Sequence, residues 1–390
     1  MSHIVIDARF WRRSAAGLST YTQSLVRNLV KLDSTNRYTI LIAPDDVAEF
    51  DIVAPNVTAL VVPIGHYSLA EQTKLPPILD RLKPDLVHFL HFNHPLRYRG
   101  RFVVTMHDLT VVYFPMGRQQ RNPLRRLAFL TVMKDAARRA DRVIAVSRTT
   151  RDDLVRDLGA DPNRISVIHE GIDLRRLHPP GVTAIHPSGV RALEALGIHQ
   201  PYLLYVSQWR PHKRIEDLVA AYERLALHRS GATGTGSSHQ HPQLQLVLTG
   251  LPNRAFPKII ARVEHSPLRH RIVTPGFVPD ELLPTLYAHA ELFVFPSLYE
   301  GFGFPPLEAM AMGTPVVSSN ASCLPEILGD AAEYFEAGNV DQLATTIAEL
   351  LVNKKRRAEL TKQGRTQAAL YDWQTVAKQT LAVYQSVLNG

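Results

Sequence analysis

Cysteine is almost absent from this chain, and long apolar runs are absent altogether. The single cysteine, Cys323, cannot form an internal disulfide, so a reducing compartment is indicated. No apolar stretch is long enough to cross a bilayer, and the opening MSHIVIDARFWRR lacks the apolar core of a secretion signal. We therefore expect a cytoplasmic protein.

Two common phosphate- and metal-binding signatures are also missing. No Gly-Lys-Ser or Gly-Lys-Thr follows the glycine turn near residue 300, which excludes a Walker-type loop, and no Asp-x-Asp motif occurs. His88, His91 and His94 stand three apart, but they pass from a strand into a loop without an acid beside them. We expect no metal and no other cofactor.

Acidic residues are scarce in the first half relative to basic ones. Residues 1–180 hold 26 Lys and Arg against 18 Asp and Glu, whereas the remainder holds 18 of each. Between Arg97 and Arg126, seven arginines face one acid, Asp108. A solvated face is one interpretation, and an anionic partner such as membrane lipid, a lipid diphosphate or nucleic acid is the other. No nucleic-acid-binding motif accompanies these arginines.

The order of strand and helix patterns predicts an α/β fold with two doubly wound domains. A length of 390 residues favours two cores. Short Val- and Ile-rich strands alternate with segments of helical periodicity, a pattern typical of parallel sheets. The alternation pauses at HPPGVTAIHPSGV, which divides residues 1–180 from 181–370. Residues 371–390 are expected to form a helix that returns to the first domain, and the low-complexity segment from Ser230 a surface loop.

A glycine turn in PSLYEGFGFPPLEAMAMG, from Pro296, joins a strand to a helix. Gly301 and Gly303 allow the backbone to approach a ligand closely. Free amides and the positive end of the helix dipole favour an anion there. Because Pro305 and Pro306 lack N–H groups, the amide donors are expected to be those of Gly303, Phe304 and Leu307.

Two acids flank this turn. Glu300 precedes it and Glu308 lies one turn into the helix, where carboxylates can accept hydrogen bonds from hydroxyl groups. A diphosphate between two polyols is a nucleotide sugar, so the arrangement predicts that ligand. A capped helix whose acids only complement its dipole is the structural alternative. The acid pair of a glycoside hydrolase is disfavoured, because it needs carboxyl groups at set separations across the bond that is cleaved.

Several segments, in this order, resemble the retaining glycosyltransferases of family 4. These are DARFWRRSAAGLSTYTQSLV, MHDLT, IHEGID, YLLYVSQWRPHKRI and EGFGFPPLE, and the resemblance covers nearly the whole chain. It implies the GT-B fold, in which two Rossmann-like domains face each other across a cleft. The first domain would bind the acceptor and the second the nucleotide sugar.

The resemblance also implies roles for individual residues. Glu300 would hold hydroxyl groups of the donor sugar, Glu308 the ribose, and Lys213 the diphosphate with help from Arg210. His107, with Asp108 as a possible partner, would lie near the transferred sugar. Further residues are implied to contact the donor or the acceptor: Gly17, Val278, Gly301, Phe302, Gly303, Phe304 and Leu307. Ser19 stands where many members of the family have a second glycine.

The function implied is transfer of α-mannose from GDP-mannose to a polyprenyl-diphosphate-linked saccharide in O-antigen or exopolysaccharide synthesis. RYRGRF and FPMGRQQRNPLRRLAFL combine arginine with apolar residues, which is typical of a surface that rests on anionic lipid, here the inner face of the cytoplasmic membrane. Four alternatives stay open: a UDP- or dTDP-sugar donor, a soluble acceptor, a non-catalytic sugar-nucleotide sensor, and a nucleic-acid-binding protein.

Overall fold

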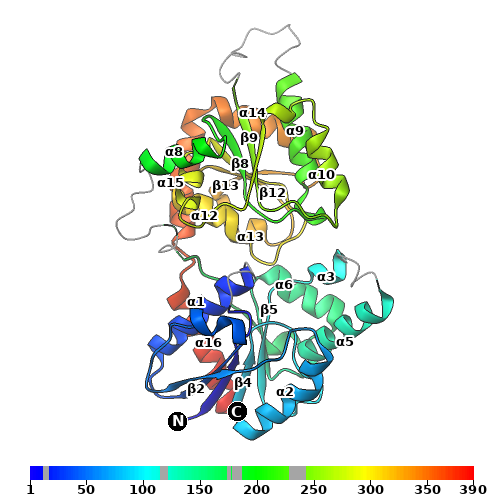
Figure 1. The fold of residues 1–390 in the computed structure, drawn as a ribbon, viewed down its shortest axis with the longest axis vertical. Coiled ribbons are helices and arrows are strands. Elements are labelled where there is room, and N and C mark those ends of the chain that lie inside the picture. Colours follow the sequence, from blue (N-terminus) through cyan, green and yellow to red (C-terminus); the bar gives the residue numbers. More distant parts are fainter. Residues whose placement is uncertain (12–16, 115–121, 174–176, 178–186, 228–242) are drawn as a thin grey trace. The chain divides into compact units, whose positions relative to one another are not determined.

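The chain forms two compact units, each with its own parallel sheet. The computed structural model describes residues 1–11, 17–114, 122–173, 177, 187–227 and 243–390 (Figure 1). The first unit comprises Met1–Gly171 and Tyr371–Gly390, and the second comprises Ile172–Leu370. Most of the expected linker and the low-complexity loop from Ser230 lie outside the described residues.

The sheet of the first unit is entirely parallel. Its order is β3-β2-β1-β4-β5-β6-β7. The strands are β1 (His3–Asp7), β2 (Arg37–Ile42), β3 (Val57–Val61), β4 (Leu86–Phe89), β5 (Phe102–Met106), β6 (Arg142–Ala145) and β7 (Ile165–Val167). Every residue of β1, β4 and β5 is buried, as expected for central strands covered on both faces.

Helices cover both faces of this sheet (Figure 1). They are α1 (Gly17–Leu32), η2 (Pro44–Glu49), α2 (Leu69–Leu82), α3 (Thr110–Tyr113), α5 (Pro123–Arg139), α6 (Arg148–Asp153), η3 (Leu154–Leu158), η4 (Pro162–Arg164) and α16 (Trp373–Leu388). The final helix, α16, packs against α1 in the first unit although it follows the second unit in sequence. Its apolar stripe, including Val376, Val383 and Tyr384, is buried there.

The second unit repeats the plan. Its parallel sheet has the order β10-β9-β8-β11-β12-β13. The strands are β8 (Tyr202–Tyr205), β9 (Gln245–Thr249), β10 (Ile272–Gly276), β11 (Leu292–Phe295), β12 (Val316–Ser319) and β13 (Ala332–Phe335). The helices are α8 (Pro187–Ala195), η5 (Pro211–Lys213), α9 (Ile215–Leu227), α10 (Pro257–Glu264), η6 (Arg269–Arg271), α11 (Leu283–Ala288), α12 (Phe304–Met312), α13 (Leu324–Leu328), η7 (Gly329–Ala331), α14 (Val340–Val352) and α15 (Lys354–Ala368).

Each sheet contains a point where the strand order reverses direction. In the first sheet it lies between β1 and β4, and in the second between β8 and β11. The loops that leave the carboxyl ends of such neighbouring strands diverge to opposite faces, so they leave a crevice in which ligands of open α/β sheets bind. The two crevices therefore locate the candidate site residues.

The α/β class with two doubly wound parallel sheets is confirmed. The sequence patterns missed three strands, the edge strands β3, β7 and β13, which are less buried than the central ones. Among the described helices, none combines the length and the apolar content that crossing a bilayer requires.

Candidate active site

Lys213 and Glu300 are held at the reversal point of the second sheet. Lys213 ends the short helix η5 after β8, and Glu300 lies in the loop after β11. The two loops are tied together through the carbonyl of His212, which accepts hydrogen bonds from the Leu298 amide at 2.7 Å and the Ser297 hydroxyl at 3.2 Å. The neighbouring strands therefore deliver one cation and one carboxylate to the same crevice.

The two charged groups contact each other directly. The Nζ atom of Lys213 lies 2.5 Å from Oε1 of Glu300, and the side chains are 12% and 11% exposed. The ammonium also lies 5.4 Å from the centre of the Phe295 ring, within the range of a cation–π contact. Burial strengthens the attraction between the two charges. If one partner is removed, however, little water is available to solvate the charge that remains.

The turn that carries Lys213 also holds Arg210 and His212. Burial of the ring, followed by the charges of Lys213 and Arg210, lowers the pKa of His212 to about 3, so this imidazole stays neutral. The half-buried Arg210 accepts a hydrogen bond on its carbonyl from the Lys213 amide at 3.0 Å, which closes the turn. Arg210 and Lys213 can then attract an anion, and the neutral His212 between them adds no third positive charge.

The N-terminus of α12 faces no side-chain cap. Gly303 occupies the cap position with a φ of 102° and a ψ of 59°, and glycine has no side chain with which to cap the helix. A methyl group added at Gly303 would also lie 3.1 Å from Cδ2 of Leu324. The position therefore requires glycine for both its conformation and its packing. The uncapped amides beside it suit an anionic ligand.

The glycine turn is braced from behind by the loop before α13. The Glu300 carbonyl accepts hydrogen bonds from the Ser322 hydroxyl at 2.8 Å and from Sγ of Cys323 at 3.3 Å, and Cys323 also reaches the Phe302 carbonyl at 3.3 Å. The single cysteine is fully buried here. These contacts fix the turn before any ligand arrives, which lowers the entropy that binding must lose.

Glu308 is oriented by a buried tyrosine. Oε2 of Glu308 accepts a hydrogen bond of 2.8 Å from the hydroxyl of Tyr287, which belongs to α11. The Tyr287 carbonyl in turn accepts a hydrogen bond of 2.5 Å from the Thr314 hydroxyl, so the tyrosine is held at both ends. This contact sets the direction of the Glu308 carboxylate, which lies on the second turn of α12.

The other predicted donor contacts lie around the same edge of the second sheet. Val278 is buried and follows β10, two strands from the crevice. Gly301 and Phe302 are buried in the turn, Phe304 begins α12 and is partly exposed, and Leu307 is fully buried. Leu307 is the fourth residue of α12, so its amide donates within the helix, and the expected contact of this amide with a ligand is wrong.

His107 stands at the carboxyl end of β5 in the first unit. Its Nδ1 lies 2.7 Å from Oε1 of Glu170, and its Nε2 lies 2.9 Å from the carbonyl oxygen of Leu90. Both partners are acceptors, so both ring nitrogens donate and the ring is an imidazolium. Burial lowers the pKa of His107, but the hydrogen bond and charge of Glu170 outweigh burial, and the pKa is raised. A ring in this state carries a positive charge and cannot serve as a general base.

The charge partner of His107 is thus Glu170, where the sequence suggested Asp108. Asp108 instead accepts a hydrogen bond of 2.7 Å from the Thr110 amide. An aspartate readily makes this local turn contact with the backbone amide two residues further along the chain. Glu170 comes from the loop after β7, and it meets His107 because parallel strands bring their carboxyl ends to one edge. Glu170 stands in IHEGID, one of the segments that carry the family resemblance, but the sequence pattern does not single out its acid.

Buried contacts fix the ring of His107 from the inside. Tyr21 of α1 packs edge-on against it with ring centres 4.6 Å apart, and the Tyr21 hydroxyl lies 3.0 Å from the Thr105 hydroxyl. His88 lies 2.9 Å from Thr105 and 2.6 Å from the Tyr384 hydroxyl on α16. Burial and the charge of His107 lower the pKa of His88 to about 3, so it stays neutral.

Two of the three histidines considered as metal ligands, His88 and His94, are engaged with other side chains. His88 has the contacts just given, and His94 pairs with Asp135 at 2.9 Å. In the parts of the chain that the structure describes, no group of three His, Cys, Asp or Glu side chains is arranged to hold a metal ion.

Gly17 is the exposed first residue of α1. The preceding residues 12–16 lie outside the described part of the chain, so the loop that was expected to approach a ligand is described only at this end. Ser19, which replaces a second glycine of the family, is buried and its hydroxyl donates to the Trp11 carbonyl at 2.8 Å. Its role here is to hold the start of the helix.

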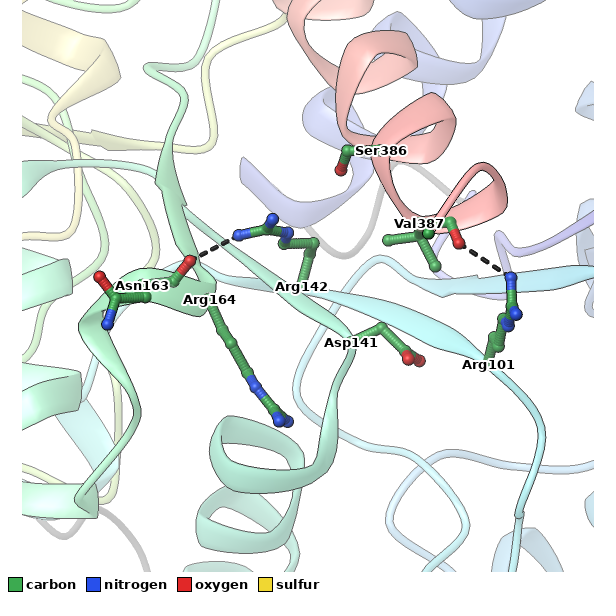
Figure 2. Close-up of a pocket in the computed structure, with 8 residues that line it drawn as sticks. Arg101, Asp141, Arg142, Asn163, Arg164, Ser386 and Val387 are labelled. Atoms are coloured by element: carbon green, nitrogen blue, oxygen red, sulfur yellow. Dashed lines mark hydrogen bonds between the residues drawn. The ribbon is translucent and has the colours of Figure 1, made fainter.

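A hollow of about 370 Å³ lies at the amino ends of strands β5, β6 and β7 of the first sheet (Figure 2). Two of its arginines donate to backbone carbonyls: Arg101 to Val387 at 2.9 Å and Arg142 to Asn163 at 2.5 Å. These contacts tie α16 and η4 to the sheet. The hollow is remote from the carboxyl ends that carry His107, so it is not the candidate site.

Together, these features define an α/β protein with two parallel sheets and a glycine turn suited to an anion, and comparison with known proteins shows its class. Residues 15–176 match the domain described as Glycosyltransferase Family 4, and residues 193–367 match Glycosyl transferases group 1. The chain is a glycosyltransferase. It belongs to the group 1 and family 4 glycosyltransferases.

Curated relatives include mannosyltransferases. The O-antigen chain mannosyltransferase B of Escherichia coli is 30% identical over 83% of this chain and 80% of its own length. The MMP alpha-(1->4)-mannosyltransferase of Mycolicibacterium hassiacum is 31% identical over 70% of this chain. That second match spans only 61% of the mycobacterial protein.

Solved structures confirm the GT-B fold. Sucrose-phosphate synthase from Thermosynechococcus elongatus is similar with a TM-score of 0.74 and 22% identity over 100% of both chains. Anabaena HepE in complex with UDP and glucose is similar with a TM-score of 0.71 and 18% identity, over 99% of this chain and 100% of that one. At these identities the likeness concerns the fold.

Proposed function

We propose that this glycosyltransferase transfers α-mannose from GDP-mannose, with retention of the anomeric configuration, to a lipid-diphosphate-linked saccharide in O-antigen or exopolysaccharide assembly. The observation that carries the proposal is the placing of Lys213 and Glu300 in one crevice, beside the uncapped start of α12. The names of two curated relatives support mannose as the sugar.

In the proposed complex, Lys213 exchanges its ion pair for the donor diphosphate, with Arg210 and the amides of Gly303 and Phe304 as further donors. Glu300 then accepts hydrogen bonds from hydroxyl groups of the sugar. Glu308, directed by Tyr287, accepts from the ribose. Each group thereby meets the ligand class that its charge favours.

The proposed reaction breaks the bond between the anomeric carbon and the diphosphate oxygen and forms a bond from that carbon to an acceptor oxygen. Negative charge grows on the leaving diphosphate, and Lys213 and the turn amides stabilise it. The acceptor proton passes to the leaving phosphate oxygen. The imidazolium state of His107 supports this route, because a ring that donates through both nitrogens cannot take that proton. No metal or other cofactor takes part in the proposal.

The acceptor is proposed to bind the first unit at the inner face of the cytoplasmic membrane, with the protein attached peripherally. Helix α5 supports this with Leu124 and Leu127, which are 76% and 62% exposed, beside the exposed Arg125 and Arg126. In contrast, Tyr98 and Phe102 of RYRGRF are buried, so that segment offers no aromatic ring to lipid. The basic segment at residues 115–121 lies outside the described residues.

A donor panel tests the proposal. Purified protein is titrated by calorimetry with GDP, UDP, dTDP and ADP, and is then incubated with GDP-mannose and EDTA. We expect tight binding of GDP alone, turnover that EDTA leaves unchanged, and an α-linked product by the anomeric proton signal. Selective binding of UDP or dTDP would contradict the GDP assignment, and a β-linked product would contradict retention. A charge-reversed Arg125→Glu, Arg126→Glu variant should lose flotation with anionic vesicles, whereas equal flotation would contradict membrane attachment.

A further inference from the structure

A group of aromatic rings gathers at the carboxyl edge of the first sheet, around Tyr67. The members of this Tyr67 cluster are Phe10, His66, Tyr67, His91, Phe92 and Phe129. The Tyr67 ring stacks on Phe129 of α5 with centres 5.0 Å apart and planes inclined by 30°, and it meets His91 edge-on at 6.0 Å. Rings from four separate segments thus form one surface.

The cluster lies at the reversal point of the first sheet. Phe10 comes from the loop after β1, His91 comes from the loop after β4, and their ring centres are 5.5 Å apart. His91 also lies 5.9 Å from His107, the predicted catalytic histidine. The cluster therefore borders the crevice where a ligand of this sheet is expected.

Tyr67 is held in a conformation that tyrosine rarely adopts. Its φ is 55°, in the left-handed region that disfavours residues with a bulky side chain. The buried carboxylate of Glu71 accepts a hydrogen bond of 3.0 Å from the Tyr67 amide. Glu71 is itself fixed by Arg9 at 2.6 Å and by the Asn93 side chain at 2.8 Å. Backbone strain maintained by such a network is typical of ligand-binding positions.

Burial of the Tyr67 ring in the core does not offset this backbone strain. Tyr67 remains 46% exposed, whereas Phe92 beneath it is 4% exposed. An exposed aromatic ring at the edge of this crevice matches a sugar, which has an apolar face of C–H groups.

We propose that the Tyr67 cluster is the platform for the terminal sugar of the acceptor saccharide, whose C–H face stacks on Tyr67. This inference rests on the proposed glycosyl transfer and names the residues that select its acceptor. Tyr67 is a specificity residue and takes no part in bond breaking.

The platform is tested by saturation-transfer NMR on the full chain with methyl glycosides of mannose, glucose and N-acetylglucosamine. We expect at least one glycoside to receive saturation mainly on the protons of one ring face. Tyr67→Asn removes the ring but keeps a residue that tolerates the left-handed backbone, so it should abolish this signal. Tyr67→Phe should keep it. Lys83→Asn is the matched control, because Lys83 is also left-handed, with a φ of 47°, at the far end of α2.

Kinetics give a second readout. With GDP-mannose and the best glycoside, Tyr67→Asn should raise the acceptor KM roughly tenfold, the order expected from loss of one aromatic contact. Hydrolysis of the donor in the absence of acceptor should stay unchanged. If Tyr67→Asn folds poorly, Phe129→Leu, which removes the ring stacked on Tyr67, should lower the saturation signal in the same way.

The inference is overturned if no glycoside receives saturation, or if the signal survives in Tyr67→Asn and in Phe129→Leu. Either result leaves the donor assignment standing when GDP still binds. Conversely, absence of GDP binding with a persisting Tyr67-dependent glycoside signal would overturn the proposed donor and retain the platform.

Discussion

Lys213 and Glu300 form an ion pair of 2.5 Å in a site that is expected to bind both a diphosphate and a sugar. The pair neutralises two nearly buried charges while the crevice is empty, and each partner has a ligand group that can replace the other. The site is thereby stable without donor, and it gains its positive character towards phosphate when Glu300 turns to the sugar.

We predict that Lys213→Met and Glu300→Gln each lower kcat/KM by about 100-fold or more, because an oriented charge at the reacting group is lost. Each single variant should also lose about 2 kcal/mol of unfolding free energy, since the remaining charge is left nearly buried without its partner. The double variant should be more stable than either single one. Urea unfolding and donor kinetics measure these changes, and additive stability losses would contradict a direct pair.

The His107–Glu170 pair predicts a pH dependence with a defined sign. The native pKa of His107 is raised above its ordinary value of 6.5. The stabilisation is therefore fully present below pH 6.5 and is lost as the pH rises through the raised native pKa. Glu170→Gln removes the charge while burial remains, so the pKa of His107 should fall.

NMR titration of the His107 ring and melting temperature as a function of pH check this prediction. Glu170→Gln should lower the melting temperature below pH 6.5 and have less effect at alkaline pH. The exposed helix residue Glu349 provides the control, as Glu349→Gln should change neither curve. An unchanged His107 titration in Glu170→Gln would refute the role of the pair.

Gly303→Ala should damage both stability and donor binding. The substitution places a methyl group 3.1 Å from Leu324 at a φ of 102°, so we expect a loss of about 1–3 kcal/mol. Gly338→Ala is the matched control, since Gly338 has a φ of 84° but open space around the added methyl. It should show the backbone penalty with unchanged GDP affinity. Calorimetry showing equal GDP affinity in the two variants would argue against an anion site at α12.

Glu308 and Tyr287 should govern recognition of the ribose. Wild-type protein is expected to bind GDP more tightly than 2′,3′-dideoxy-GDP, because a carboxylate accepts hydrogen bonds from the ribose hydroxyls. Glu308→Ala should abolish this preference. Tyr287→Phe removes the hydroxyl that lies 2.8 Å from Glu308 and should reduce the preference several-fold. Competition binding measures both, and a preference that persists in Glu308→Ala would place the ribose elsewhere.

The sequence by itself determined the class of fold, the glycine turn and the family. Alternating strand and helix patterns indicate parallel sheets because the periods of 2 and 3.6 residues are local properties of the chain. Likewise, glycine, proline and acid at fixed offsets define the turn at residues 300–308, because a strand-to-helix turn needs few distant contacts.

Only the tertiary structure decided which residues are partners. Glu170 meets His107 across 63 positions, Tyr287 meets Glu308 from a separate helix, and Tyr67 joins rings from separate loops. Such pairs form because parallel strands bring their carboxyl ends to the same side of the sheet. The separation of two residues in the sequence does not show whether the fold brings them together. The choice of Glu170 over the adjacent Asp108 follows from the same cause, since a local turn engages Asp108 while the fold delivers Glu170 to the ring.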